Sequence, residues 1–211
     1  SIEKYRVSPD LINKVSSGKW NIKQNQEEQM EKDAMAARGY YQAFKLVKDS
    51  LVSIYRGKNA GDVVEVDHRD WYRELFAPSV RAGIIKAEDM AGYRNQQVFV
   101  AQSHHTPVDR DGLRDMMSTF FELLKNEPNA AVRAVLGHFV FVFIHPYMDG
   151  NGRIASFLMH AMLANGGYPW TVIPVEQREL YMECMELGSG ESDHGAFGKW
   201  LDAVVSEGGE G

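Results

Sequence analysis

Cysteine, basic charge and long apolar runs are all scarce in this sequence of 211 residues. Its single cysteine, Cys184, has no partner for an internal disulfide, which excludes a disulfide-stapled secreted scaffold and favours a reducing compartment. Lysine and arginine total 23 against 29 aspartates and glutamates, and the net charge of −6 argues against bulk electrostatic binding of nucleic acid. The longest apolar run, Phe139–Ile144, has six residues. A membrane-spanning helix needs about 20.

The first residues bear on where the chain works. The segment SIEKYRVSPD has no apolar stretch of the kind that a signal peptide carries, so we expect a cytoplasmic protein that does not enter the membrane. Because the first residue is Ser1 rather than methionine, we interpret the sequence as part of a longer protein.

Hydrophobic periodicity predicts a mainly α-helical chain after an irregular arm over residues 1–25. Apolar residues recur at three- and four-residue steps, which predicts helices over 26–55, 68–76, 113–124, 132–143, 154–162, 176–187 and 194–205. Pro78 is expected to end the second of these helices. Residues 93–107 differ, because Val98, Phe99 and Val100 lie together between polar residues, and we expect a short β-hairpin there.

One connector between two predicted helices, HPYMDGNGR at residues 145–153, has the composition of a nucleotide site. Gly150 and Gly152 flank Asn151 in a turn that leads into a helix, and such a turn presents backbone N–H groups to an anion. Arg153 adds a permanent charge whose fork suits phosphate oxygens.

Two titratable side chains complete this connector. Asp149 offers the hard oxygen that Mg²⁺ takes when it is shared with substrate phosphates. His145 is the side chain best suited to accept a proton near neutral pH. Together with the turn, they indicate a Mg²⁺-nucleotide site with a general base four residues before the metal ligand.

A dinucleotide-binding fingerprint competes with this interpretation, because residues 150–155 fit G-x-G-x-x-A. Five residues separate that fingerprint from the apolar run over 139–144, whereas the fingerprint follows its strand directly. The apolar stripe also extends back to Val132 at helical spacing, which favours a helix over a strand. We therefore reject a doubly wound sheet.

The connector resembles the signature of the Fic (Fic/Doc) family, HPFx[D/E]GN[G/K]R, at every position except Tyr147, which replaces phenylalanine by another aromatic residue. This resemblance implies a Fic-type helical bundle with a small β-hairpin flap, the predicted hairpin at 93–107. It also implies an N-terminal arm and helix over 1–61, a Fic-like catalytic domain over 62–205 and a loose tail over 206–211.

The activity implied by the resemblance is protein adenylylation, the transfer of AMP from Mg²⁺-ATP to a Tyr, Thr or Ser hydroxyl with release of pyrophosphate. In that family pattern His145 is the catalytic base and Asp149 holds Mg²⁺. The turn of Gly150, Asn151 and Gly152 binds phosphate together with Arg153. The protein substrate docks at the flap near Val98, Phe99 and Val100.

Two other activities remain open on the same residues. One is removal of AMP from a modified protein, with Asp149 and Mg²⁺ activating water. The other is a nucleotide-binding regulatory module with weak transfer activity, because Ser156 stands where the family often has a second arginine that contacts the γ-phosphate. Gly152 favours adenylyl transfer over phosphate transfer, since Doc-type relatives carry lysine at that position.

Overall fold

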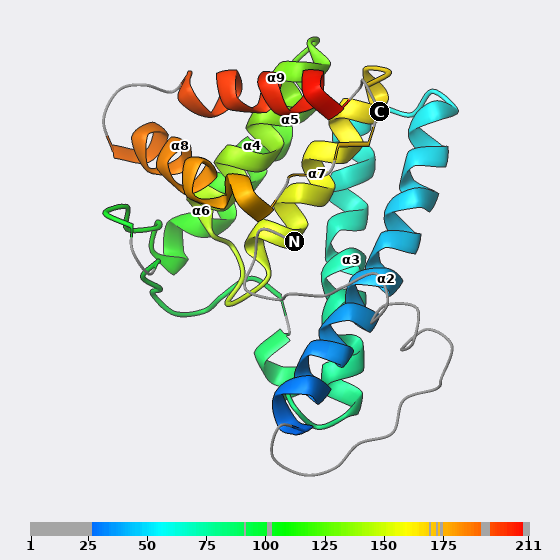
Figure 1. Cartoon of the computed structure of the whole chain (residues 1–211), viewed down its shortest axis with the longest axis vertical. Helices are drawn as coiled ribbons and strands as arrows, with labels where there is room; N and C mark the ends of the chain where they lie inside the picture. The colour runs from blue at the N-terminus through cyan, green and yellow to red at the C-terminus, as the bar shows by residue number, and fades with distance from the viewer. Residues whose placement is uncertain are drawn as a thin grey trace.

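The computed structural model describes residues 27–90, 92–100, 103–168, 170, 171, 173, 175–190 and 195–208. These residues form helices joined by loops (Figure 1). The α-helices are α2 (Glu27–Tyr55), α3 (Ala60–Arg81), α4 (Arg110–Asn126), α5 (Ala130–Val135), α6 (Phe141–Ile144), α7 (Asn151–Asn165), α8 (Arg178–Gly190) and α9 (Ala196–Gly208). Shorter turns are the 3₁₀ segments η1 (Ala87–Met90) and η3 (Val175–Gln177) and the π-helical η2 (Leu136–Val140). The predicted arm over 1–25 lies outside the described residues.

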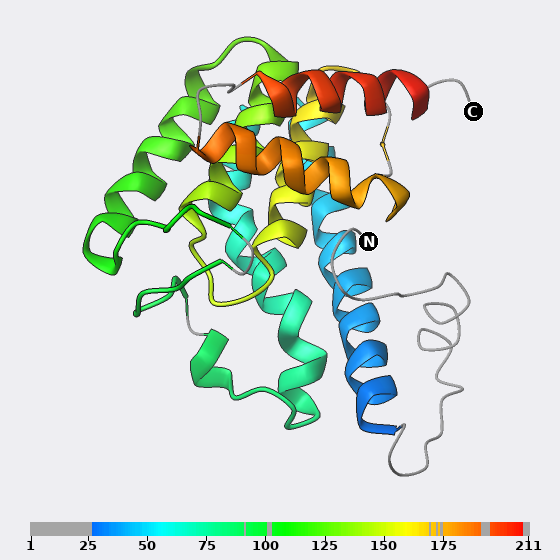
Figure 2. The same cartoon turned by 60° about the vertical axis from the view of Figure 1, so that its left-hand side comes forward.

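Helix α7 occupies the centre of the fold. Every residue from Phe157 to Ala164 is buried, because α7 packs against α2 and α3 on one side and against α5, η2 and α6 on another (Figures 1 and 2). A helix that is apolar on all sides must lie inside a protein. The N-terminus of α7 is thereby fixed in place by the core around it.

Helices α2 and α3 form an antiparallel pair that flanks α7 (Figure 1). A tight turn at residues 56–58 reverses the chain between them, and Asn59 caps α3 by accepting a hydrogen bond from Asp62 N at 3.2 Å. The pair approaches closely at Gly39, where an added Cβ would lie 1.9 Å from Leu75 O. Glycine is therefore required at this crossing of the two backbones.

The predicted short helix at 68–76 proves to be the 22-residue α3, and the expectation that Pro78 ends it is wrong. Proline removes only its own N–H, whereas its carbonyl still accepts from Ala82 N at 3.0 Å. The last turn therefore forms beyond the proline. The amphipathic helix expected over 113–124 is confirmed as α4, with Asp109 as its cap and Leu113, Met117 and Leu124 buried.

The expected β-hairpin at 93–107 is absent from the described residues of that segment, 93–100 and 103–107, which form an irregular loop. Side chains take up the carbonyl groups that a ladder would use. Gln97 Nε2 donates to Pro107 O at 2.8 Å, and the Arg94 guanidinium donates to Gln96 O at 3.0 Å and to Val108 O. Pro107 has no N–H to return to an opposite strand. The implied Fic-type bundle is thus all-helical in the part of the chain that the structure describes.

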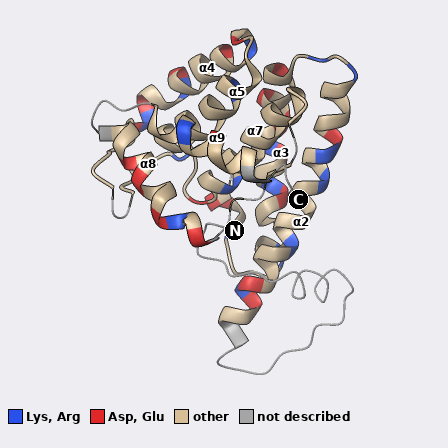
Figure 3. Cartoon of the chain, turned by 45° about the horizontal axis from the view of Figure 1, so that its top comes forward, with Lys and Arg blue, Asp and Glu red and all other residues tan. Residues whose placement is uncertain are grey.

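Charge is mixed along the outer helices. Both signs of charge occur along α2 (Figure 3), where Glu31, Lys32 and Asp33 lie near the start and Arg38, Lys45 and Lys48 follow. Across the described ranges, no helix is both long enough and apolar enough to cross a bilayer.

Gly39→Ala is expected to lower the free energy of unfolding by about 2 kcal/mol, because the methyl group must push α2 away from the α3 backbone. Gly198 of α9 provides the matched control. Its added Cβ would meet nothing closer than Val135 Cγ2 at 3.8 Å, so Gly198→Ala should stabilise by up to about 1 kcal/mol through helix propensity. Urea unfolding measures both; equal effects of the two substitutions would contradict the close approach.

Candidate active site

The loop between α6 and α7 and the first turn of α7 together hold all six of the predicted site residues. Helix α6 ends at Ile144, and His145 then turns the backbone into the left-handed region with φ 54° and ψ 57°. His145 is the only non-glycine residue with positive φ in the described chain. Left-handed backbone is strained for a side chain of this kind and persists only where the surroundings impose it.

Asn151 closes this loop from the other end. Its side chain accepts a hydrogen bond from Tyr147 N at 2.9 Å and donates to Tyr147 O at 2.8 Å. Asn151 is buried, and its two hydrogen bonds satisfy the backbone N–H and C=O of Tyr147, which would otherwise need water as a partner. The side chain of Asn151 therefore holds the loop, and the predicted phosphate binding by the turn of Gly150, Asn151 and Gly152 falls to its backbone N–H groups.

Tyr147 anchors the middle of the loop in the core. Its ring stacks on Tyr72 with centroids 3.7 Å apart and an interplanar angle of 7°. Its hydroxyl is buried and makes no hydrogen bond to any residue that the structure describes. The ring therefore does the anchoring, as the phenylalanine of the resembled signature would.

Arg94 fixes the strained residue from outside the loop. Its Nε donates to His145 O at 2.8 Å, and its backbone N–H donates to Pro146 O at 2.8 Å. The same guanidinium binds Val108 O, so one buried side chain ties the 92–109 loop to the α6–α7 loop, which lie side by side in Figure 2. Charged donors make stronger bonds than neutral ones, and these bonds are made to carbonyls that the turn leaves without helix partners.

His145 is poised to accept a proton. Its Nδ1 lies 3.3 Å from Val142 O, and because a carbonyl only accepts, this contact requires the hydrogen on Nδ1 and leaves the lone pair on Nε2. Burial is the main cause that lowers the pKa of His145 below its ordinary value of 6.5, and the nearby Arg94 charge lowers it further. The imidazole is therefore neutral at pH 7.

The N-terminus of α7, at the other end of the same loop, has the features of an anion site. Gly150 precedes the helix with φ 79° and has no side chain to cap it, and the first helical hydrogen bond runs from Ile154 N to Gly150 O at 3.0 Å. The N–H groups of the first turn and the helix dipole therefore face the loop. Arg153 lies over the Phe76 ring, 5.0 Å from its centroid, with Nη2 3.4 Å from Asp149 Oδ2.

Asp149 is the one carboxylate of the loop, and its side chain is 54% exposed. Its Oδ1 accepts from Gly150 N at 2.6 Å, which orients the group without enclosing it. No group of three or more His, Cys, Asp or Glu side chains suited to a metal occurs among the described residues. A single accessible carboxylate fits Mg²⁺ that keeps its waters and shares substrate phosphates, rather than a metal held in an all-protein cage.

A family comparison decides what this loop belongs to. Residues 65–163 match the family model described as "Fic/DOC family". These residues form a Fic/DOC family domain.

Curated relatives agree with the assignment. The chain is 32% identical over 172 residues to a protein of Nematostella vectensis named "Protein adenylyltransferase Fic", an alignment that covers 79% of this chain and 36% of the relative. It is 34% identical over 113 residues to the protein of that name in Drosophila willistoni, covering 52% of this chain and 22% of the relative. The chain thus spans about a third or less of the length of these relatives.

Solved structures share the fold. Fic-1 (residues 134–508) from C. elegans superposes with a TM-score of 0.76 at 20% identity, covering 98% of this chain and 57% of that one. A Fic domain-containing signalling protein from Bacteroides thetaiotaomicron gives 0.72 at 16% identity, covering 98% of this chain and 80% of that one. The helical arrangement of Figure 1 is therefore the Fic fold.

Within the Fic domain, sequence reasoning missed the groups that hold the loop from a distance. Arg94 lies in the segment predicted to form the hairpin, and neither it nor Tyr72 and Phe76 on α3 carries a local signal of a site. Ser156 is the departure from the family pattern. Its hydroxyl donates to Gly152 O one turn back in α7, at 2.9 Å, and brings no charge to the site.

Arg94→Ala is expected to lower the free energy of unfolding by about 3 kcal/mol, because it leaves buried carbonyls of two loops without donors. Urea unfolding measures this effect. Arg73→Ala is the control, since Arg73 is exposed and pairs only with the exposed Asp70, and it should change stability by no more than about 0.5 kcal/mol. Similar effects of the two variants would show that Arg94 does not hold the loops together.

Proposed function

We propose that this chain transfers AMP from Mg²⁺-ATP to a hydroxyl group of a protein, releasing pyrophosphate. The observation that carries the proposal is His145, held in a strained turn with the lone pair of Nε2 available, at the anion-binding start of α7. A base and an anion site adjoining each other are what attack on a phosphate ester requires. The name of the relatives, protein adenylyltransferase, supports the same chemistry.

The proposed step begins at the target hydroxyl. His145 Nε2 takes its proton as the hydroxyl oxygen forms a bond to the α-phosphorus. The bond between that phosphorus and the bridging oxygen breaks, and its electron pair leaves with pyrophosphate. Because burial lowers the pKa of His145, the base is unprotonated before the reaction and needs no preceding proton loss.

The start of α7 would hold the α-phosphate in this scheme. Glycine at 150 and 152 exposes the backbone N–H groups of the first turn, and the positive end of the helix dipole favours the negative charge that grows on the phosphate oxygens. Arg153 would neutralise the next phosphate from a position fixed by Phe76 and Asp149. Asp149 would hold Mg²⁺, which when bound supplies further charge neutralisation on the phosphates.

The protein substrate is proposed to dock along residues 98–100. Phe99 is 79% exposed, and the described residues of this loop form no strand ladder. Val98 O accepts from Gln97 Nε2 and Val100 O accepts from Ser103 N, so the backbone at Phe99 is the part open to a partner strand. Addition of an extended segment to an exposed backbone is a common mode of peptide recognition. It would bring the target hydroxyl past Arg94 toward His145.

Labelled nucleotides test the activity. With Mg²⁺ and ATP labelled at the α-phosphate, the label should appear on this protein or on proteins of a lysate, and a target should gain the mass of AMP. His145→Ala should reduce labelling by about a hundredfold or more, because it removes the base. His104→Ala, which removes an exposed histidine from outside the site, should label like the original protein.

The alternatives give different results in the same assay. Transfer of label from the γ-phosphate but not from the α-phosphate would contradict adenylylation. Release of AMP from a modified protein, without labelling, would instead favour the hydrolytic activity. Binding of ATP without transfer would favour a regulatory module.

The pH profile tests the role of His145. Because burial lowers the pKa of His145 below 6.5, the fall in the rate of labelling with decreasing pH should have its midpoint below pH 6.5, as the imidazole becomes protonated. Rates are measured at saturating ATP. A midpoint above pH 6.5 would contradict the lowered pKa.

Unfolding at low pH would also lower the rate of labelling, so it must be distinguished from protonation of His145. Burial lowers the pKa of His68 to about 4 and that of His138 to about 3. The unfolded state therefore binds more protons than the folded state below pH 6.5, and stability falls as the pH falls. Near-UV circular dichroism at each pH identifies the range in which the protein is still folded.

A further inference from the structure

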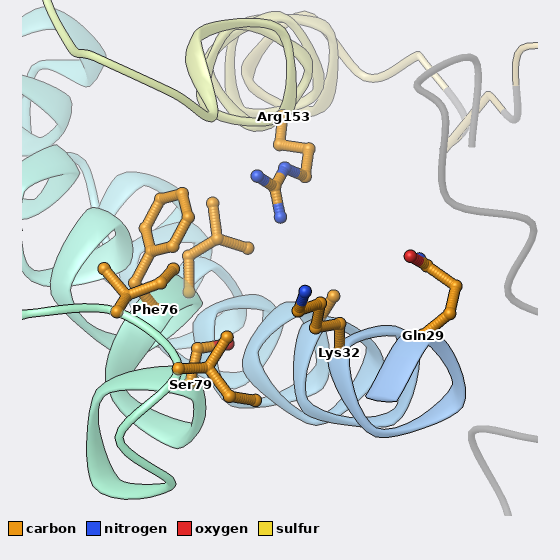
Figure 4. Close-up of a pocket in the computed structure, with 9 residues that line it drawn as sticks. Gln29, Lys32, Phe76, Ser79 and Arg153 are labelled. Atoms are coloured by element: carbon orange, nitrogen blue, oxygen red, sulfur yellow. The ribbon is translucent and has the colours of Figure 1, made fainter. Parts of the chain in front are cut away.

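A groove of about 1380 Å³ lies between α3, α4 and the loop at residues 92–95. Pockets for whole small-molecule ligands usually measure about 300–1,000 Å³, so this groove has room for a segment of a protein. A smaller pocket of about 280 Å³, in which Lys32 of α2 faces Arg153 of α7 (Figure 4), shares no lining residue with it. The groove is therefore a separate feature of the surface.

The charge of the groove is opposite in sign to that of the whole chain. Five arginines and three carboxylates line the groove, whereas the chain carries a net charge of −6. Each of the three carboxylates is already held in an ion pair, in the pairs Asp70–Arg73, Asp111–Arg110 and Glu65–Lys125. The carboxylates of the groove therefore leave some of its arginines without a counter-charge.

Arg69 on α3 and Arg114 on α4 are the arginines that can receive an anion. Neither makes an ion pair with a residue that the structure describes, and both are exposed. The Arg69 guanidinium lies over the Tyr93 ring, 5.6 Å from its centroid, and hydrogen-bonds the uncharged hydroxyl of that residue. Arg69 is thus held in place before a ligand arrives, which lowers the entropic cost of binding. The remaining arginine, Arg94, is committed to backbone carbonyls.

The uncharged lining of the groove resembles a protein interface. The rings of Tyr72, Tyr93 and Phe121 line it, and Val66 beside them is 72% exposed. Arginine and aromatic residues are enriched where proteins bind each other. An exposed apolar side chain among them offers a contact that a protein segment uses and a free inorganic anion does not. The lining therefore favours a protein partner.

The groove adjoins both the loop proposed to dock the substrate and the candidate active site. Tyr93 lines the groove, and Val98 follows it by five positions, which is at most about 17 Å of chain. Arg94 also lines the groove and donates to His145 O at 2.8 Å. A protein bound along residues 98–100 therefore needs only a few further residues to reach the groove.

We propose that the groove binds an acidic segment of the protein substrate, an inference that rests on the proposed function. Carboxylates of that segment pair with Arg69 and Arg114, whose guanidinium groups can each donate two parallel hydrogen bonds to one carboxylate. The segment lies close in the substrate sequence to the hydroxyl that receives AMP. Complementary charge of this kind selects among partners and speeds their encounter.

Two labelled peptides of equal length test the chemistry of the partner. Each contains one tyrosine, flanked in the first peptide by several glutamates and in the second by glutamines at the same positions. By fluorescence anisotropy at low salt, the wild-type chain should bind the acidic peptide about tenfold more tightly than the neutral one. Arg114→Glu should weaken the acidic peptide about tenfold and leave the neutral peptide unchanged, because it reverses one charge of the groove.

Arg56→Glu is the matched control for that variant. It makes the same change in net charge at an exposed residue that does not line the groove, so it should bind the acidic peptide like the wild type. Equal weakening by Arg56→Glu and Arg114→Glu would overturn the role of the groove, as would equal affinities of the wild type for the two peptides. A wild-type dimer that Arg114→Glu dissociates, measured by sedimentation, would place a second copy in the groove and also overturn the proposal.

Transfer of label from α-labelled ATP separates this inference from the proposed function. The acidic peptide should be labelled with a kcat/KM about tenfold above that of the neutral peptide, and Arg114→Glu should remove the difference. If the acidic peptide binds selectively but neither peptide is labelled, the groove assignment stands and the proposed transferase activity fails. If both peptides are labelled and bound equally, the transferase activity stands and the groove assignment fails.

Discussion

The turn at His145 is the constraint on which the rest of the site depends. A non-glycine residue in the left-handed region is strained, and three contacts hold this residue and the loop that follows it. Arg94 binds its carbonyl, Asn151 binds the peptide of Tyr147, and the Tyr147 ring is stacked on Tyr72. These contacts fix the distance between the imidazole and the start of α7. A loop that relaxed into helical geometry would move the imidazole away from the start of α7.

The core explains why the site is so well supported. Helix α7 is enclosed on several sides, so its N-terminus cannot move without disturbing α2, α3 and α5. Close packing of this kind resists small displacements. The charged groups of the site lie at the edge of that core, where Asp149 remains accessible and Arg153 is buried against Phe76. The residues of α7 behind the loop are thus tightly packed, whereas the carboxylate of Asp149 stays accessible.

The α6–α7 loop and the loop that contains residues 98–100 differ in how firmly they are held. The α6–α7 loop is anchored in the core through Tyr147 and Asn151, whereas residues 98–100 make no ladder within the described chain and expose Phe99. Arg94 joins the two loops. It belongs to the same loop as residues 98–100, and its backbone N–H and side chain donate to carbonyl groups of the α6–α7 loop. A segment bound along residues 98–100 would therefore be aligned relative to His145 by the same arginine that holds the turn.

The sequence by itself determined that the chain is mainly helical, that its charge is mixed and which connector resembles the family signature, because these depend on local periodicity and on nine consecutive residues. Only the tertiary structure decided the rest. Arg94 meets His145 across 51 positions, and Lys32 faces Arg153 from another helix, which no spacing rule predicts. The prediction of a β-hairpin at 93–107 was wrong for a related reason. Its residues have strand composition, but the carbonyls that a ladder needs are taken by Arg94 and Gln97, whose positions are set by the fold around them.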